Sequence, residues 1–361
     1  MKSLLAVLSF LLLGIESHLT AQEASRGIDV HATLTAETVA SNQLSDEPRN
    51  GSPIILATRS VVYPILKLSD DWSITGAVQA ATRPYFYQDF STEGYGFKGN
   101  LLQAALSYSR VSNRGSLVFH AGERPSAFGA FVLRYDETSN PLVNTPPGYG
   151  YYYAPVSFLG VTAAQVDATR GKWDSRLQFA NSSPANPRNL FAKDQYGNWA
   201  GGGGYTIRQG LRVGVSGYRG PYLDRHYAYF YPGEASPNTL PAHGVGIDAN
   251  WSHRHSWAFV EAQKFVMPYT LFPSFRESTA YGELRQDLSP RWFAAMRYSY
   301  TCNSVTGKLH ALEAGGAYRL NRHQTLKLSY EEQRYQGRNK APYHTLGIQL
   351  VTSMHRTFFS K

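Results

Sequence analysis

Apolar residues alternate with polar ones along most of this chain. The side chains between the apolar positions are mainly Gln, Ser, Asp, Arg and Asn. The clearest series cover residues 72–80, 102–108, 173–179, 211–215, 245–251, 292–300, 326–330 and 346–350. Successive side chains of a β-strand point to opposite faces, so this period of two predicts strands with one apolar face and one polar face.

The composition indicates that the apolar face of these strands meets lipid. Aromatic residues make up 14 % of the chain, glycine contributes 32 residues, and charged residues are only 17 %. Typical soluble domains contain roughly a quarter charged residues. After residue 22 no stretch approaches the ~18 apolar residues that a transmembrane helix needs. Aromatic-rich, weakly charged strands without such a helix are typical of a membrane β-barrel.

Aromatic residues also stand at the ends of the apolar series. They are Trp72, Tyr108, Trp173, Trp251, Trp292 and Tyr330. An amphipathic ring prefers the headgroup level of a bilayer, and membrane barrels carry such rings as girdles. A soluble two-sheet β-protein has no reason for this placement, so the pattern favours a membrane barrel.

The N-terminus has the pattern of a targeting segment. Lys2 precedes an apolar run over residues 4–15, and small residues at 19–21 form a cleavage site. The run is too short to span a bilayer as a helix. We expect residues 1–21 to be a removed signal peptide and residues 22–361 to fold as one domain. An uncleaved membrane anchor is the alternative.

The connections predict the number of strands. Seven short polar connections lie at 69–71, 112–115, 170–171, 209–210, 253–255, 289–290 and 321–322. They alternate with eight mostly longer ones at 43–52, 84–98, 127–154, 183–197, 222–241, 268–275, 303–307 and 336–342. These connections join sixteen strands, although 53–68 and 256–267 alternate poorly and fourteen or eighteen strands stay open. Both termini fall on the short-turn side, which in outer-membrane barrels is the periplasm.

At this point the chain resembles the sixteen-stranded porins. Its longest connection, 127–154, is the third long one, and the third loop of general porins folds into the barrel and narrows it. The sequence Gly-Glu-Arg-Pro-Ser-Ala-Phe-Gly at 122–129 is similar to the strand exit of phosphate-selective and related porins. One departure is the ending Phe-Phe-Ser-Lys at 358–361, since many outer-membrane proteins end on an aromatic residue.

Together the pattern and the resemblance predict an all-β fold, a transmembrane antiparallel up-and-down barrel whose long third loop enters the lumen. The resemblance implies a porin in the outer membrane of a bacterium, surrounded by lipid, through which small hydrophilic solutes or anions diffuse passively. Whether the barrel is a monomer or a homotrimer stays open.

Alternation assigns charged side chains to the lumen. The basic ones are Arg124, Arg176, Arg212, Arg297 and Lys327, and the acidic ones are Glu37, Asp167, Asp248, Glu283, Glu313 and Glu331. The long third loop adds Arg134, Asp136 and Glu137. With a net charge of +9, we expect basic residues to predominate in the lumen. Rings of Arg or Lys select anions. We hypothesise that wall arginines face Asp136 and Glu137 across a constriction with weak anion preference.

Aromatic residues follow in the same loop, at Tyr149, Tyr151, Tyr152 and Tyr153. They are candidates for stacking on sugar rings. The alternative is that they pack the loop against the wall, because so long a loop must bury something to stay in place.

Other kinds of function find less support in the sequence. Basic residues are scattered and do not form the clusters of a nucleic-acid-binding protein. With one cysteine and no zinc-type spacing, we expect no disulfide, metal or cofactor. An outer-membrane lipolytic enzyme would need a Ser nucleophile, a His base and a third group, and no such motif is recognisable. A plugged structural barrel, for instance one that helps attach surface polysaccharide, is the stronger rival.

Overall fold

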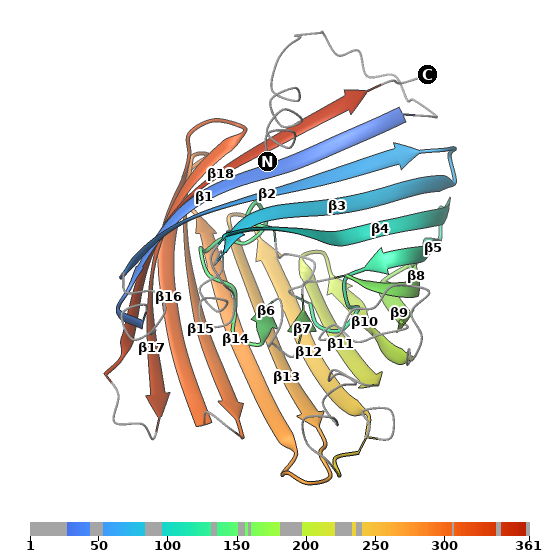
Figure 1. Cartoon of the computed structure of the whole chain (residues 1–361). Coiled ribbons are helices and arrows are strands. Elements are labelled where there is room, and N and C mark those ends of the chain that lie inside the picture. The colour runs from blue at the N-terminus through green and yellow to red at the C-terminus, as the bar shows by residue number, and fades with distance from the viewer. Residues whose placement is uncertain are drawn as a thin grey trace.

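The computed structural model is a closed antiparallel β-barrel of sixteen strands (Figure 1). Neighbouring strands pair in chain order, and β1 closes the barrel against β18. The structure describes residues 27–43, 53–83, 96–130, 136–150, 156–157, 160–180, 197–220, 233–235, 240–304, 307–336 and 341–358. The predicted fold class and strand number are confirmed. The proposed signal peptide lies outside the described residues.

The sixteen barrel strands are β1 Gly27–Ser41, β2 Ile54–Lys67, β3 Trp72–Arg83, β4 Gly96–Ser112, β5 Gly115–Arg124, β8 Val161–Arg170, β9 Trp173–Ala180, β10 Asn198–Arg208, β11 Leu211–Gly220, β12 Ala242–His253, β13 Ser256–Met267, β14 Phe275–Asp287, β15 Trp292–Asn303, β16 Gly307–Arg319, β17 Gln324–Gln336 and β18 Tyr343–Phe358. Two further short strands, β6 Tyr149–Gly150 and β7 Val156–Ser157, pair with each other in the connection between β5 and β8. Both segments with poor alternation, 53–68 and 256–267, are therefore strands.

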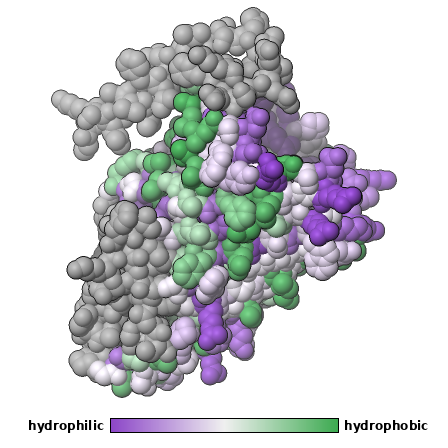
Figure 2. All heavy atoms as spheres, turned by 90° about the vertical axis from the view of Figure 1, so that its right-hand side faces the viewer, coloured by the Kyte–Doolittle hydropathy of each residue, from purple (hydrophilic) through white to green (hydrophobic). Residues whose placement is uncertain are grey.

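The two faces of each strand differ as the alternation predicts. In β17, Leu328 is 51 % exposed on the outside, whereas its neighbour Lys327 is only 3 % exposed on the inside. Figure 2 shows hydrophobic side chains gathered on one outer face of the barrel, with hydrophilic ones towards its margins. Apolar residues on the outside and polar residues on the inside invert the usual soluble arrangement, as expected of a barrel in lipid.

Connections at one end of the barrel are short, and those at the other are mostly longer. The strands β2 and β3, for example, are joined by 68–71, whereas β5 and β8 are joined by 125–160. The start of β1 and the end of β18 lie at the short-turn end, because β1 runs from that end and β18 returns to it. We call the two ends the turn end and the loop end.

The outer rim of the turn end carries paired aromatic side chains. The pairs are Trp72–Tyr108, Trp173–Tyr205 and Trp292–Tyr318, with ring centroids 4.9, 4.6 and 4.6 Å apart. Each pair joins two adjacent strands close to a short turn. Trp72, Tyr108, Trp173 and Trp292 of the expected girdle belong to these pairs, whereas Tyr330 lies in the middle of β17. No helix in the described part of the chain is long and apolar enough to cross a membrane.

Candidate functional site

The connection between β5 and β8 contacts inward-facing side chains of distant strands. Its Glu137 carboxylate forms an ion pair with Arg59 of β2, at 2.6 Å, and both side chains are buried. The neighbouring Asp136 accepts hydrogen bonds from the hydroxyls of Tyr63 and Thr33, which lie on β2 and β1. The acidic turn of the loop is therefore attached to the wall where the barrel closes.

The opposite flank of this turn is held by Lys327 of β17. Its buried ammonium group donates to the backbone carbonyls of Glu137 and Asn140. A lysine has three donors and no acceptor, so backbone oxygens are suitable partners. This contact fixes the loop backbone without using a loop side chain.

A second cluster of buried charges holds the loop further along, at Asn144. Arg297 of β15 is bracketed by Glu283 at 3.1 Å and Glu313 at 2.5 Å, and its guanidinium also donates to the Asn144 carbonyl. The Asn144 backbone N–H donates to Glu313 at 3.1 Å, and its side-chain amide donates to Glu331 at 2.8 Å. Buried charges need such partners, because an unpaired charge in the interior is costly.

The first predicted aromatic residue of the loop, Tyr149, is packed against the wall. Its hydroxyl donates to Glu261 at 2.7 Å and accepts from Gln263 at 2.6 Å, and the residue is 2 % exposed. The buried ring has no free face on which a sugar could stack. Tyr151, Tyr152, Tyr153 and Arg134 lie outside the described residues.

Across the lumen, strands β8 to β12 carry a different set of charges. Arg176 pairs with Asp167 at 3.1 Å, while Arg212 pairs with Asp174 at 2.6 Å and with Asp248 at 2.8 Å. These side chains are partly exposed, and that of Arg212 keeps 34 % of its surface accessible. They form a row of alternating charges along the wall.

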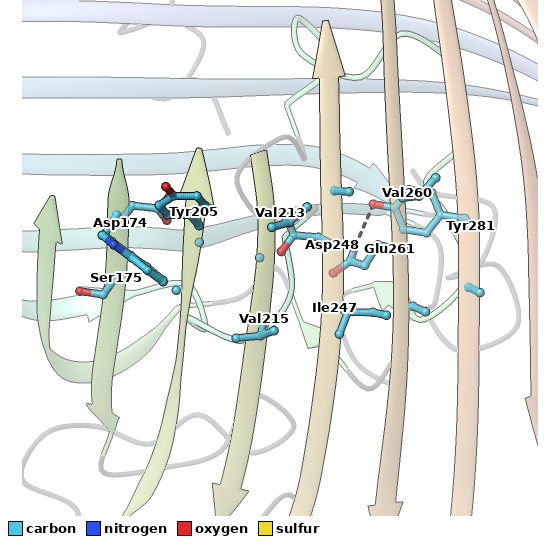
Figure 3. Close-up of a pocket in the computed structure, with 17 residues that line it drawn as sticks. Asp174, Ser175, Tyr205, Val213, Val215, Ile247, Asp248, Val260, Glu261 and Tyr281 are labelled. Atoms are coloured by element: carbon cyan, nitrogen blue, oxygen red, sulfur yellow. Dashed lines mark hydrogen bonds between the residues drawn. The ribbon is translucent and has the colours of Figure 1, made fainter. Parts of the chain in front are cut away.

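Glycines make room for this row. A Cβ atom on Gly204 would lie 2.2 Å from the Arg212 guanidinium, and one on Gly214 would lie 2.5 Å from the Asp248 carboxylate. Both glycines occupy inward-facing positions without a side chain, so the Arg212 side chain can lie against the backbone of the wall. Figure 3 shows Asp174 and Asp248 on this part of the wall, together with the hydrogen bond from Tyr281 to Glu261.

An inner cavity of about 430 Å³ separates the row from the start of the third loop. Its lining includes Asp167, Arg176 and Arg212 on the wall and Gly129 and Ala130 on the loop. The charged row therefore faces an open space inside the barrel.

Arg124 stands near this row but is bonded differently. Its guanidinium lies 3.4 Å from Nδ1 of His120, and its Nε has no hydrogen-bond partner among the described residues. Unlike Arg176 and Arg212, it forms no ion pair with a carboxylate of the described residues.

The predicted site residues thus divide into two groups. Asp136, Glu137, Arg297 and Lys327 come together at the third loop, whereas Arg124, Arg176 and Arg212 lie on the wall of β5 to β11. The arginine that faces the acidic turn is Arg59 of β2, which is outside the predicted set, whereas Arg124, Arg176 and Arg212 have other neighbours. The sequence did not single out Arg59, since the poor alternation of 53–68 obscured which of its residues point inward.

The expected predominance of basic residues in the lumen is also not found among the buried side chains. The buried acids of the strands and the third loop are Glu37, Glu137, Glu261, Glu277, Glu283, Glu313 and Glu331, against Arg59, Arg297 and Lys327 as the buried bases. Much of the positive charge of the chain must therefore lie elsewhere, on its outer face and in its connections.

One chain of contacts has the residue types of a catalytic triad, namely a serine, a histidine and an aspartate. The Ser107 hydroxyl lies 2.7 Å from Nδ1 of His120, whose Nε2 lies 3.2 Å from Asp167. Ser107 is buried, and Asp167 is shared with Arg176 and Gln165, so the contact belongs to the network of the wall. Within the described ranges, no group of three or more His, Cys, Asp or Glu residues could hold a metal ion.

No protein-family model matches this sequence. No curated protein matches it either. Among solved structures, OprB of Pseudomonas putida has a TM-score of 0.63 at 9 % identity, over 91 % of this chain and 94 % of that one. OmpF of Salmonella typhi, in complex with daunomycin, has a TM-score of 0.61 at 10 % identity, over 91 % and 98 %.

An anion-selective porin from Comamonas acidovorans is similar as well, with a TM-score of 0.56 at 9 % identity, over 92 % of this chain and all of that one. Identities this low show a shared fold. The chain has the closed sixteen-stranded barrel of the porins.

Proposed function

We propose that this protein is an outer-membrane porin through which small hydrophilic solutes diffuse passively. The observation that carries the proposal is a closed barrel with apolar side chains outside and, inside, a cavity lined by charged residues beside the third loop. A barrel of this size with a polar interior forms an aqueous channel. The third loop narrows this channel, because its acidic turn and Asn144 are attached to one side of the wall.

The proposal includes a weak preference for anions. On the side of β8 to β12, Arg124, Arg176 and Arg212 stand beside Asp167, Asp174 and Asp248, so the formal charges of the row cancel. The proposed preference therefore rests on Arg124, the arginine of this set that forms no ion pair among the described residues. A preference that depends on one unpaired cation is small. Lining cations attract anions, and the nearby carboxylates limit the effect.

The test is a planar-bilayer recording of the purified protein across a KCl gradient. Open-channel current with a reversal potential towards that of chloride supports the proposal, and the Arg124→Ala, Arg176→Ala double variant should lose that preference. Arg334→Ala, which removes an outward-facing charge, is the matched control and should leave the reversal potential unchanged. Ohmic current without ion preference would keep the channel and remove the anion preference.

A plugged structural barrel is the second candidate, because the third loop is held by two buried clusters of charge. The same recording separates the two: no current from correctly folded protein would favour the plugged barrel. A lipolytic enzyme finds less support, because the buried hydroxyl of Ser107 faces the lumen and not the lipid. Absence of ester hydrolysis by the purified barrel would agree with a channel.

We include three further features in the proposal. Residues 1–21 are removed on export, both termini lie in the periplasm, and three copies associate through the apolar outer face of β2 to β4. Leu56 on that face is 72 % exposed in the single chain. N-terminal sequencing of the mature protein tests the cleavage. Native mass in detergent tests the trimer, which Leu56→Lys should dissociate and Leu328→Lys on the far wall should not.

A further inference from the structure

The outer rim of the loop end carries positive charge along one half of its circumference. We name these outward side chains the cationic arc: Arg219 on β11, His243 on β12, Lys264 on β13, Arg276 on β14, Lys308 and His310 on β16, Arg334 on β17 and His344 on β18. All are exposed except His310, which is half-exposed.

Strand register makes the arc continuous. Arg219 is directly opposite His243, and His310 is directly opposite Arg334. Between these pairs, Lys264 is opposite Ser278, Ser278 is opposite Cys302, and Cys302 is opposite Lys308. A single row across four strands thus has a lysine at each end, separated by roughly 14 Å at the usual spacing of strands.

The rest of the same rim lacks such residues. On β1 to β5 and β8 to β10, no Lys, Arg or His occurs among the described outward residues near the loop end. Exposed apolar side chains occupy this level instead, namely Ile54, Leu56, Phe97, Leu101, Phe179 and Trp199. The outer rim of the turn end carries the aromatic pairs described above. Along the loop end, the cationic arc is therefore confined to one half of the described barrel.

The height of the arc places it beside lipid headgroups. On the same outward face, exposed apolar residues follow within two to four positions towards the barrel middle, such as Val260 after Lys264 and Leu312 after Lys308. A cation costs about 2–4 kcal/mol at the bilayer midplane of a barrel but about 0–1 kcal/mol near the interface. The charges stand where they are tolerated and where an anionic headgroup can reach them.

Few negative charges compensate the arc. Among the described outward residues near the arc, the single carboxylate is that of Glu332. It forms an ion pair with Arg334. Two tyrosine hydroxyls lie against histidines of the arc, Tyr298 at 2.7 Å from Nδ1 of His310 and Tyr330 at 2.6 Å from Nδ1 of His344. When the hydroxyl donates to Nδ1, the neutral ring carries its proton on Nε2, which can donate to an anion.

We propose that the cationic arc binds the phosphate groups of an anionic lipid in the leaflet on the loop side, with Lys264, Arg276 and Lys308 as its centre. Clusters of exposed basic residues at a membrane surface bind anionic headgroups in this way. The inference rests on the proposed outer-membrane location. The inference goes beyond that location, because it assigns binding of a phosphate-bearing lipid to one leaflet and to one half of the barrel.

The test compares lipid binding to the whole purified barrel in neutral detergent. The probe is diphosphoryl lipid A, with monophosphoryl lipid A, phosphatidylcholine and free pyrophosphate as comparisons, and bound lipid is counted by native mass spectrometry. We expect the affinity to fall from the diphosphoryl to the monophosphoryl form, with weak binding of phosphatidylcholine and pyrophosphate. The triple variant Lys264→Gln, Arg276→Gln, Lys308→Gln should bind diphosphoryl lipid A about tenfold more weakly.

The matched control removes the same charge at the turn end, with Lys172→Gln, Arg208→Gln and Arg291→Gln. Equal weakening in both triple variants, or equal binding of all lipids by the unmodified protein, would overturn the proposal. Pyrophosphate binding as tight as that of the lipid would point to a soluble anion as the ligand instead. The triple variants should keep the channel current of the unmodified protein, so loss of current tests the porin function separately.

Cys302 gives a second measurement that needs no variant. It is the one cysteine of the chain and lies in the row between Lys264 and Lys308. Diphosphoryl lipid A bound on this row should slow alkylation of the Cys302 thiol by a maleimide, whereas phosphatidylcholine should slow it much less. Equal alkylation rates with both lipids would show that the row is not the binding site.

Discussion

The two sides of the inner wall use the same kinds of ion pair for different purposes. On the side of β13 to β17 and β2, Arg297 is 2 % exposed between two glutamates, and Arg59 and Lys327 are bonded to the third loop. On the side of β8 to β12, Arg176 and Arg212 keep about a third of their side-chain surface accessible. Their aspartates are accessible to a similar degree, except Asp248.

Burial decides what each pair does. A buried pair is expensive to break, because removal of one partner leaves a charge in the interior, whereas an exposed pair contributes little to stability. The buried side therefore fixes the position of the loop. The accessible side can exchange partners with water and ions, which a channel wall requires. The predictions below test this division.

Replacement of Arg297 should have the largest effect on stability. Arg297→Met leaves Glu283 and Glu313 buried without their cation, which should cost about 3–5 kcal/mol in the free energy of unfolding. The loop also loses its bond at Asn144, so single-channel conductance should rise. Urea unfolding in lipid vesicles and bilayer recordings measure the two effects. Arg212→Met is the matched change on the accessible side, and an equal loss of stability in both would contradict the division.

Replacement of Lys327 should release the acidic turn of the loop with a smaller loss of stability. Lys327→Met leaves the carbonyls of Glu137 and Asn140 without a donor, which should lower the free energy of unfolding by about 1–3 kcal/mol. We expect increased conductance and more frequent current fluctuations than in the unmodified protein. Ser329→Ala on the same inner face is the control, because the Ser329 hydroxyl has no partner in the described structure. Unchanged conductance in Lys327→Met would show that Arg59, Tyr63 and Thr33 hold the loop turn without Lys327.

Replacement of Arg212 should change selectivity more than stability. Arg212→Gln leaves Asp174 and Asp248 without their cation beside the inner cavity, so the reversal potential should shift towards cation preference. The free energy of unfolding should change by less than about 1 kcal/mol, because these groups are accessible to solvent. Arg208→Gln at the turn end is the control. A reversal potential that moves equally in both would place the selectivity outside the charged row.

The smallest expected effect is a pH dependence of the contact that Glu234 makes with Thr270 and Leu271, in the connections of the loop end. Partial desolvation raises the pKa of Glu234, but backbone N–H donors of Thr270, Leu271 and Ala235 outweigh it and hold the pKa below its usual value. A depressed pKa means that the contact stabilises the folded loops above the ordinary range for Glu, about pH 4.3, and is lost as the pH falls through the folded-state pKa.

Hydrogen exchange of the Thr270 and Leu271 amides, corrected for intrinsic rates, should therefore show less protection in acid than at neutral pH. Glu234→Gln should have reduced protection at neutral pH and little pH dependence. Channel conductance should be unaffected, because this contact lies away from both sides of the inner wall. An unchanged exchange profile in Glu234→Gln would show that the carboxylate does not hold these two connections together.

Much of the fold could be predicted from the chain because the relevant signal is local. Alternation placed Lys327, Arg212 and Arg297 on the inner face, and the turn residues predicted sixteen strands. Each of these inferences depends on neighbouring residues and on the difference between lipid and water at the two faces of a strand. The assignment failed at Arg59, where polar and apolar residues of 53–68 do not alternate clearly.

Which residues those inward side chains contact could not be predicted from the sequence, because the contacts join distant parts of the chain. Asn144 and Glu313 are 169 residues apart, and Lys327 is 190 residues from Glu137. Their contacts are set by the register of many strand pairs and by closure of β1 on β18, which no local pattern contains. The sequence by itself determined which face each side chain of a regular strand takes. Only the closed barrel decided which charges are buried against the third loop and which line the inner cavity, because burial depends on residues that meet across the lumen.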